Sequence, residues 1–287
     1  MSRASAAGFE LGDHVCWCID DPVSRLDMAA AFVAAGLGTG DRVVWCTAAP
    51  LAAIAGLREL GVAVAAALDA GQLSLPSPAD WYLEDGQLIA EAVVRKLASE
   101  VADARAAGYS GLWAIADMSW AHRAGVSADA LARYELLLNR AVIGGFVTLA
   151  CQYDRRLLRH RQLRPITMAH PGTIYQWPPS DTERSLLRIL RDGPVLRLIG
   201  DSDLSNRLAL HFCVAELRDD CAVSGVPMMI DASALRFADG ATANLMLQSA
   251  RTVPGGLIVH CSRQLRSTLD LLGGAAEPSL SYGDHMR

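Results

Sequence analysis

The sequence predicts an α/β fold in two domains, each built around a largely parallel sheet. Short apolar segments typical of strands alternate with longer helical segments, from HVCWCI at 14–19 to LIVHC at 257–261. The apolar runs are nearly continuous, which is typical of parallel strands covered on both faces. A polar stretch at 172–194, which contains Pro178-Pro179, interrupts this alternation once. The length of 287 residues suits two domains of roughly 100–200 residues each.

In the first part of the chain, each predicted strand leads into a helix. Asp21 and Pro22, which follow HVCWCI, are residue types preferred at a helix N-cap and at the first helical position. From Leu26 onward, apolar residues recur at i, i+3, i+4 and i+7, so they form one buried helical face. The same reasoning predicts further strands at 42–48, 62–68, 112–118 and 146–153, a helix that ends near Gly61, and helices at 85–107 and 127–140.

The second part is predicted to be a shorter α/β domain. We place the first domain at 1–175, a linker with a short connecting helix at 176–193, and the second domain at 194–287. Strands are predicted at 195–201, 226–233 and 257–261, and helices at 205–220, 241–252 and 263–272.

Composition excludes several classes of function. The formal net charge is −5 and Lys96 is the only lysine, so the chain lacks the concentrated basic face that nucleic acids require. No apolar stretch reaches the roughly 18–20 residues of a membrane span, and the N-terminus has no apolar core of a signal peptide. We therefore expect a cytoplasmic protein. Its seven cysteines, an odd number, are expected to be reduced and mostly buried.

The predicted pocket of the first domain lies beyond the carboxyl ends of its strands, where ligands of parallel sheets bind. The same positions are also compatible with ordinary loop starts. The candidate ligand-binding residues on or after these strands are His14, Cys16, Cys18, Cys46, Asp117, Trp120, Cys151 and Tyr153.

His14, Cys16 and Cys18 should share one face of their strand, because side chains alternate with a period of two. Cys46 and Cys151 could join them from neighbouring strands. This pattern leaves open a redox or metal sensor based on cysteine, alongside simple packing. No residue is assigned as a metal ligand, and no cofactor is expected.

The sequence contains no G-x-S-x-G, H-E-x-x-H or paired-carboxylate motif. The nearest candidate catalytic group, Asp117, Ser119 and His122, has an unremarkable spacing. We therefore expect that the protein is not an enzyme.

Six segments of the first domain carry a family resemblance: GDHVCW (12–17), FVAAGLGTGDRVVWC (32–46), GYSGLWAIADMSWA (108–121), YELLLN (134–139), CQYD (151–154) and AHP (169–171). Together they resemble the MEDS sensory domain, a family named for regulators of methanogens and methylotrophs. One departure is Ala116-Asp117, where the family tends to have Gly-Glu, so that the charge is kept on a shorter side chain. The resemblance implies a domain that senses small, hydrocarbon-derived molecules.

The second of these segments also looks like part of the RecA-like ATPases of the circadian-clock type. Those enzymes hold phosphates with G-x-x-x-x-G-K-[ST], and this chain has no such motif. We therefore expect a RecA-like, three-layer parallel-sheet domain that does not hydrolyse ATP.

Residues 194–274 resemble a STAS domain, the module of anti-sigma-factor antagonists. The resemblance is carried by LRLIGDSDLSN (196–206), MIDASALRFADGATANLM (229–246) and Leu271-Leu272-Gly273. It implies binding to an anti-sigma factor or a related regulatory protein. The candidate partner-binding residues are Asp203, Ser205, Asp239, Gly240 and Thr242.

In antagonists of this family, a serine directly after the aspartate is phosphorylated, which switches binding off. Here Gly240 follows Asp239, and Ala241 comes next, so neither position offers a hydroxyl. We therefore expect a ligand-responsive signalling regulator that acts by protein contact without the usual phosphoserine switch. A self-associating scaffold of a stress-signalling complex is an alternative, and a homo-oligomer is compatible with it.

Overall fold

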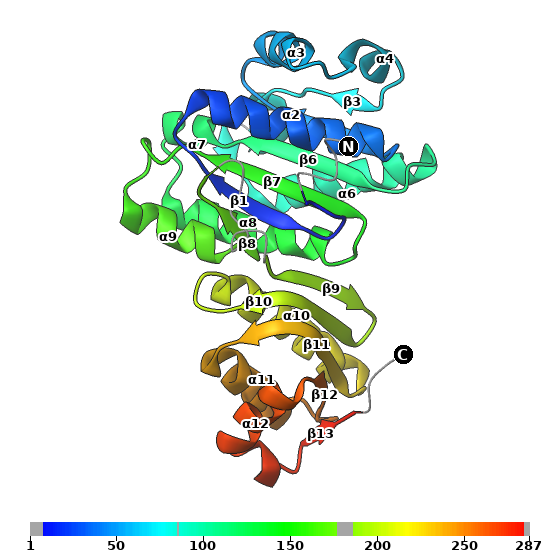
Figure 1. Ribbon diagram of the computed structural model, residues 1–287, viewed down its shortest axis with the longest axis vertical. Helices are drawn as coiled ribbons and strands as arrows, with labels where there is room; N and C mark the ends of the chain where they lie inside the picture. The colour runs from blue at the N-terminus through cyan, green and yellow to red at the C-terminus, as the bar shows by residue number, and fades with distance from the viewer. Residues whose placement is uncertain (1–7, 85, 177–185, 284–287) are drawn as a thin grey trace.

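The computed structural model describes residues 8–84, 86–176 and 186–283 of the chain. Two α/β units follow one another along the long axis of the molecule, the N-terminal unit in blue to green and the C-terminal unit in yellow to red (Figure 1). Within the described residues, no helix is long and apolar enough to cross a membrane.

The N-terminal unit is built on a six-stranded sheet in the order β3-β2-β6-β7-β1-β8. Every neighbouring pair in this sheet is parallel, and β1 lies between β7 and β8. This is the parallel sheet that the sequence predicts for the first domain. Its strands are β1 (His14–Cys18), β2 (Arg42–Cys46), β3 (Leu73–Ser74), β6 (Leu112–Asp117), β7 (Val147–Tyr153) and β8 (Gly172–Ile174); β4 (Leu83–Glu84) and β5 (Gln87–Leu88) form a separate hairpin.

Helices cover both faces of this sheet, which makes three layers (Figure 1). Alternate side chains of β1 separate accordingly: Val15 and Trp17 pack with Phe32 of α2, whereas Cys16 and Cys18 belong to the core beneath α6 and α8. The helices of this unit are α2 (Pro22–Gly38), α3 (Pro50–Glu59), α4 (Val64–Asp69), α5 (Pro78–Tyr82), α6 (Ala90–Ala106), α7 (Ser119–Arg123), α8 (Ala128–Val142) and α9 (His160–Met168).

The C-terminal unit has a five-stranded mixed sheet in the order β13-β12-β11-β10-β9. Only β9 is antiparallel to its neighbour; the other pairs are parallel. Its elements are β9 (Arg188–Asp192), β10 (Val195–Ser202), α10 (Arg207–Ser224), β11 (Met228–Ala238), α11 (Gly240–Thr252), β12 (Leu257–Cys261), α12 (Arg263–Leu271), the 3-10 turn Gly274–Ala276 and β13 (Leu280–Tyr282).

Two predictions of secondary structure are wrong. The segment predicted as a strand at 62–68 is largely helix α4, because four of its seven residues are alanines, which favour helix. The predicted linker and connecting helix at 176–193 end in a strand, β9, which joins the C-terminal sheet. The part of this segment at 177–185 lies outside the described residues. The short elements β3, α5, β4, β5, α7, β8 and β13 and helix α9 were not predicted, and β5 lies within the predicted helix at 85–107, which begins at Ala90.

The two units meet through ion pairs and apolar packing. Arg188 on β9 contacts the buried Asp13 directly before β1, with Nε 2.7 Å from Oδ1. Arg140 of α8 pairs with Glu216 of α10 at 2.6 Å and lies over the ring of Phe212. The start of β1 and the end of α8 therefore both touch the C-terminal unit.

Candidate functional site

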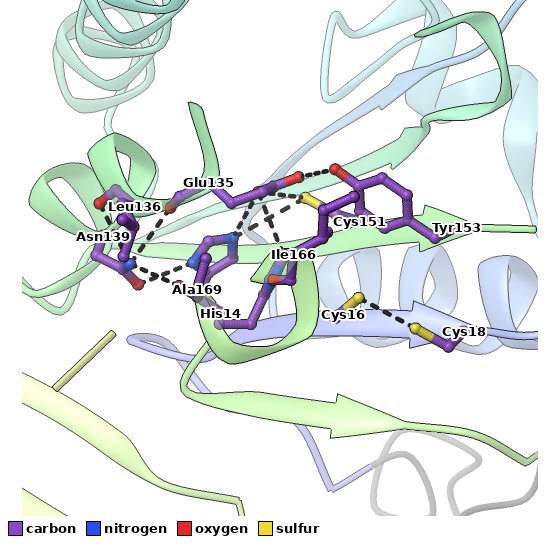
Figure 2. Close-up of polar contacts among 11 residues, drawn as sticks. His14, Cys16, Cys18, Glu135, Leu136, Asn139, Cys151, Tyr153, Ile166 and Ala169 are labelled. Carbon is purple, nitrogen blue, oxygen red and sulfur yellow. Dashed lines mark hydrogen bonds and ion pairs between the residues drawn. The ribbon is translucent and has the colours of Figure 1, made fainter. Parts of the chain in front are cut away.

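A buried polar cluster lies between the sheet and helices α8 and α9 of the N-terminal unit (Figure 2). Its four central side chains come from four elements: His14 from β1, Glu135 from α8, Cys151 from β7, and His170 from the turn after α9. The parallel pairing of β1 and β7 places Cys16 opposite Cys151. His14 and Cys151 therefore lie on the same face of the sheet, the one that α8 covers. One ligand atom from each of the four lies within 4.8 Å of those of the others.

The carboxylate of Glu135 is the centre of this cluster. Its Oε2 lies 3.2 Å from His14 Nε2, 3.2 Å from His170 Nε2 and 3.4 Å from Cys151 Sγ. Its Oε1 accepts a short hydrogen bond of 2.5 Å from the Tyr153 hydroxyl. The side chains of Glu135 and both histidines are fully shielded from solvent.

The Nδ1 atoms of both histidines, which face away from Glu135, are held by hydrogen bonds. His14 Nδ1 donates to Asn139 Oδ1 at 2.9 Å, and His170 Nδ1 donates to the carbonyl of Ile166 at 2.8 Å. Asn139 is in turn oriented by donating its amide to the carbonyls of Glu135, Leu136 and Ala169. These contacts fix both rings, with their Nε2 atoms turned toward Glu135.

Burial and neighbouring charge set the ionisation of the cluster. Burial lowers the pKa of His14, and the nearby His170 ring lowers it further, so the neutral imidazole is favoured. Burial alone would raise the pKa of Glu135, but the two histidines outweigh it and hold this pKa below its usual value. Burial raises the pKa of Cys151 well above the usual value, and the Glu135 charge adds to the effect.

A small apolar cavity of about 20 Å³ borders this cluster on the side of Cys151. Its wall includes Cys46, Tyr82 and Tyr134. A volume of this size suits one small molecule of the size of water.

The predicted ligand-binding residues separate into three groups. His14, Cys151 and Tyr153 meet in the cluster. Cys16 and Cys18 lie apart from it, with Sγ atoms 3.3 Å from each other, and Cys46 lines the small cavity. The last two, Asp117 and Trp120, lie at the carboxyl end of β6.

At the carboxyl ends of the strands, ion pairs occupy the place of the predicted pocket. Arg25 of α2 bridges Asp117 at 2.9 Å and Asp154 at 3.3 Å, and Arg156 binds Asp154 at 2.6 Å. Trp120 is buried and stacks on Tyr82, with ring centroids 4.8 Å apart. The buried cluster therefore lies apart from the predicted pocket at the carboxyl ends of the strands.

The thiols of this unit have the properties of buried packing residues. Burial raises the pKa of Cys16 well above its usual value and that of Cys46 to about 12. All seven cysteines are free thiols, and six of them are buried. Reactive thiols need exposure and a lowered pKa, so these features give no support to a redox sensor.

The predicted partner-binding residues surround the start of α11. Asp239 is its N-cap: its carboxylate accepts from the backbone N–H of Thr242 at 2.8 Å and pairs with Arg207 at 2.9 Å. Gly240 is exposed. Thr242 is buried, and its hydroxyl lies 2.8 Å from that of Ser202, so it is part of the packing.

Asp203, Ser205 and Asp239 face the N-terminal unit across a groove of about 720 Å³. The opposite wall is formed by helix α9 with its flanking residues Arg155 and Tyr175. The residues that line this groove are Arg155, His160, Leu163, Arg164, Thr167, Met168, Tyr175, Asp203, Leu204, Ser205, Phe237 and Asp239.

Glu135, Asn139 and His170 were not predicted as site residues. Glu135 lies four residues after Leu131 and three before Leu138, so a charged side chain interrupts an apolar helical face. This position of Glu135 could have identified it as a site residue, because a buried charge needs a partner or a function. Four of the segments that carry the MEDS resemblance, namely those with His14, Glu135, Cys151 and His170, converge at this cluster.

Comparison with known proteins identifies the N-terminal unit. The family model described as MEDS, "MEthanogen/methylotroph, DcmR Sensory domain", matches residues 13–171. That match does not reach the C-terminal unit, whose resemblance to STAS domains therefore stays a prediction.

No match was found among curated proteins. Among solved structures, the crystal structure of flagellar accessory protein FlaH from Methanocaldococcus jannaschii is similar, with a TM-score of 0.43 and 11% identity over 72% of this chain and 88% of that chain. The family match covers more than half of the sequence and includes all four residues of the buried cluster. The chain therefore belongs to the MEDS family of sensory-domain proteins.

Proposed function

We propose that this protein is a ligand-responsive signalling regulator whose sensory domain controls the binding of a partner protein at the C-terminal unit. The observation that carries the proposal is the groove in which Asp203, Ser205 and Asp239 face helix α9. The surface that the STAS-like sequence marks for a partner is thus also a surface shared with the sensory domain.

The two walls of the groove have opposite charge. Arg155 and Arg164 lie on the sensory side, and Asp203 and Asp239 lie on the other. Arg155 and Asp239 also pair within their own units, with Asp20 at 3.0 Å and Arg207 at 2.9 Å. The opposite charges still favour contact across the groove, so a partner that binds Asp239 would compete with the sensory domain for it. A partner with a basic contact surface fits this acidic wall.

The elements around the buried cluster are also those that touch the C-terminal unit. His14 follows Asp13, which binds Arg188, and Glu135 shares helix α8 with Arg140, which binds Glu216. His170 is bonded to Ile166 of α9, and α9 forms one wall of the groove. A ligand that favours one arrangement of these elements would therefore shift the groove as well.

The partner that best fits the STAS-like sequence is an anti-sigma factor or a related regulatory protein. Gly240 follows Asp239 and carries no hydroxyl, so regulation falls to the sensory domain and not to a phosphoserine at this position. The proposal assigns no catalytic step to the chain. It places the protein in the cytoplasm, which suits seven free cysteines.

Capture of candidate anti-sigma factors by the full chain tests the proposal. Asp239→Lys should weaken capture at least tenfold, because it reverses the charge of the acidic wall. Asp219→Lys is the matched control: Asp219 is exposed on α10, 12 residues beyond Arg207 and so about 18 Å along the helix. Equal capture by the wild type and both variants would reject the proposal.

Arg164→Glu provides the reciprocal test from the sensory side. This change repels the acidic wall and should free it, so capture of the same partner should rise. A fall in capture to the level of Asp239→Lys would show that α9 takes part in binding and does not compete with the partner.

A further inference from the structure

The buried cluster of His14, Glu135, Cys151 and His170 presents four electron-pair donors to one point. Two imidazole nitrogens, one thiol sulfur and one carboxylate oxygen converge there, each from a different element. The geometry points to a binding site for one divalent transition-metal ion of the zinc class, held by these four side chains. This inference does not depend on the proposed partner or on the groove.

The hydrogen bonds of the histidines turn the correct atoms inward. The Ile166 carbonyl can only accept, so the proton of the His170 ring must sit on Nδ1. Asn139 donates its amide to three carbonyls, so its oxygen faces His14 and fixes the proton of that ring on Nδ1 as well. Both rings therefore hold Nδ1 in a hydrogen bond and turn Nε2 toward Glu135.

A nitrogen lone pair directed at a carboxylate repels it unless a proton or a metal ion lies between the two. His170 Nε2 is 3.2 Å from Glu135 Oε2, yet it is buried and makes no hydrogen bond. Protonating both rings would place two cations with centroids 4.3 Å apart against a single buried carboxylate. A metal ion satisfies all four donors without that cost.

The separations between the donor atoms match a tetrahedral site. Bonds of about 2.0–2.3 Å from zinc to nitrogen, oxygen and sulfur imply distances of about 3.3–3.6 Å between ligand atoms. Glu135 Oε2 lies 3.2 Å from each histidine nitrogen and 3.4 Å from Cys151 Sγ. Cys151 Sγ lies 3.9 Å from His14 Nε2, and all four donor atoms lie within 4.8 Å of one another, so the donors that are farthest apart must move closer to complete the geometry.

The donor set selects the class of metal. Two imidazoles and a thiolate suit zinc, cobalt and related borderline ions, whereas magnesium and calcium prefer oxygen ligands alone. The surrounding bonds also fit, because Asn139 and the Ile166 carbonyl hold the histidines and Tyr153 holds the carboxylate. Four protein ligands in a fully buried site resemble a closed structural or sensory site more than a catalytic one.

Cobalt(II) is the probe that reports both coordination and the thiolate ligand. The full chain, kept reduced with a phosphine, is stripped with a chelator and titrated with Co²⁺, and zinc is also measured in protein purified without chelator. We expect one metal per chain, visible bands of tetrahedral cobalt, a near-ultraviolet sulfur-to-cobalt band, and displacement of cobalt by zinc. A folded wild-type chain that holds neither metal, by either route, would overturn the inference.

Matched variants locate the site. Cys151→Ser should abolish the sulfur-to-cobalt band. Cys46→Ser should keep it, because Cys46 is a buried thiol outside the cluster, on β2, which β6 separates from β7. Asn139→Ala, which frees His14, should weaken binding by about 10–100-fold while the bands remain. A sulfur band that survives in Cys151→Ser, or that is lost equally in Cys46→Ser, would overturn the assignment.

Discussion

Two charged clusters lie on the N-terminal sheet, and they differ in what they leave unpaired. At the carboxyl ends of the strands, two arginines, Arg25 and Arg156, are matched to two carboxylates, Asp117 and Asp154. Beneath helices α8 and α9, one carboxylate faces two imidazole nitrogens and a thiol.

The comparison separates a structural cluster from a candidate ligand site. In the cluster of Arg25, Arg156, Asp117 and Asp154, each charged side chain pairs with one of opposite charge. The buried cluster has more electron-pair donors than protons to share among them, which is the property of a site that takes up a cation. The position favoured by the topology of parallel sheets thus holds the cluster whose charges are already paired.

Glu135→Leu should have the largest effect on the folded state. The change leaves His14, His170 and the Tyr153 hydroxyl buried without their central partner, and we expect a loss of about 3–5 kcal/mol in the free energy of unfolding. Urea denaturation of chelator-treated protein, followed by tryptophan fluorescence, measures it. This signal reports the N-terminal unit, which holds Trp17, Trp45, Trp81, Trp113 and Trp120.

Glu91→Gln is the control for that measurement. Glu91 pairs with Arg133 on the exposed surface, so its replacement should leave the urea midpoint unchanged. Equal midpoints for the Glu135 and Glu91 variants would show that the buried cluster contributes nothing to stability.

Arg188→Met should have the next largest effect, because it leaves the buried Asp13 unpaired. The Arg188 side chain is 16% exposed, so we expect a loss of about 3 kcal/mol, at the low end for a broken buried pair. Limited proteolysis between the two units should also become faster. Arg236→Met removes an exposed pair with Asp201 and should change neither property; equal behaviour of the two variants would contradict the interpretation.

Arg25→Met tests whether the edge cluster is only structural. Asp154 keeps Arg156 as a partner, so we expect a smaller loss of about 1.5 kcal/mol in the same denaturation experiment. Cobalt uptake should be the same as in the wild type, since Arg25 contacts none of the four donors. Loss of cobalt uptake without loss of folding would mean that the two clusters act as one.

Asp239→Ala should have the smallest effect, about 1 kcal/mol, because it removes the N-cap of α11. Asp239→Asn keeps the cap and serves as the control. Burial alone would raise the pKa of Asp239, but its bonds to Thr242 and Arg207 hold this pKa below the usual 3.8.

The charged cap therefore adds its full contribution above the ordinary pKa of 3.8, and the contribution is lost as the pH falls through the lower value of the folded protein. Acid titration of stability in the wild type and Asp239→Asn checks this. The difference between them should vanish at low pH, and a constant difference would contradict the assignment.

Periodicity and turn chemistry were enough to predict the α/β class and most helices and strands of the chain. They were not enough at 62–68, where the alternation of valine and alanine also fits a helix. They also missed α9, where Pro165 inside the helix weakens the local pattern. Strand β9 was missed although it forms a local hairpin with β10 across Gly193 and Pro194, because the segment was interpreted as a linker with a helix.

The candidate site was predicted only in part. Alternation within one strand predicts that His14 shares a face with Cys16 and Cys18, and Cys151 was expected to join them from a neighbouring strand. His170 follows a helix that was not predicted, and Glu135 was hidden in a helix whose other buried residues are apolar. Bringing these four residues together depends on the strand order, which places β1 beside β7, and no local pattern encodes that order.

The antiparallel strand β9 affects how the C-terminal unit can be studied alone. It pairs with residues Val195–Ile199 of β10 and is the edge strand on that side of the sheet, so the backbone of β10 is not exposed there. A fragment that begins at Pro194 would expose the N–H and C=O groups of β10 along an apolar strand, which is a template for aggregation. Self-association of such a fragment would reflect the cut, whereas a fragment that begins at Leu186 keeps the strand that protects this edge.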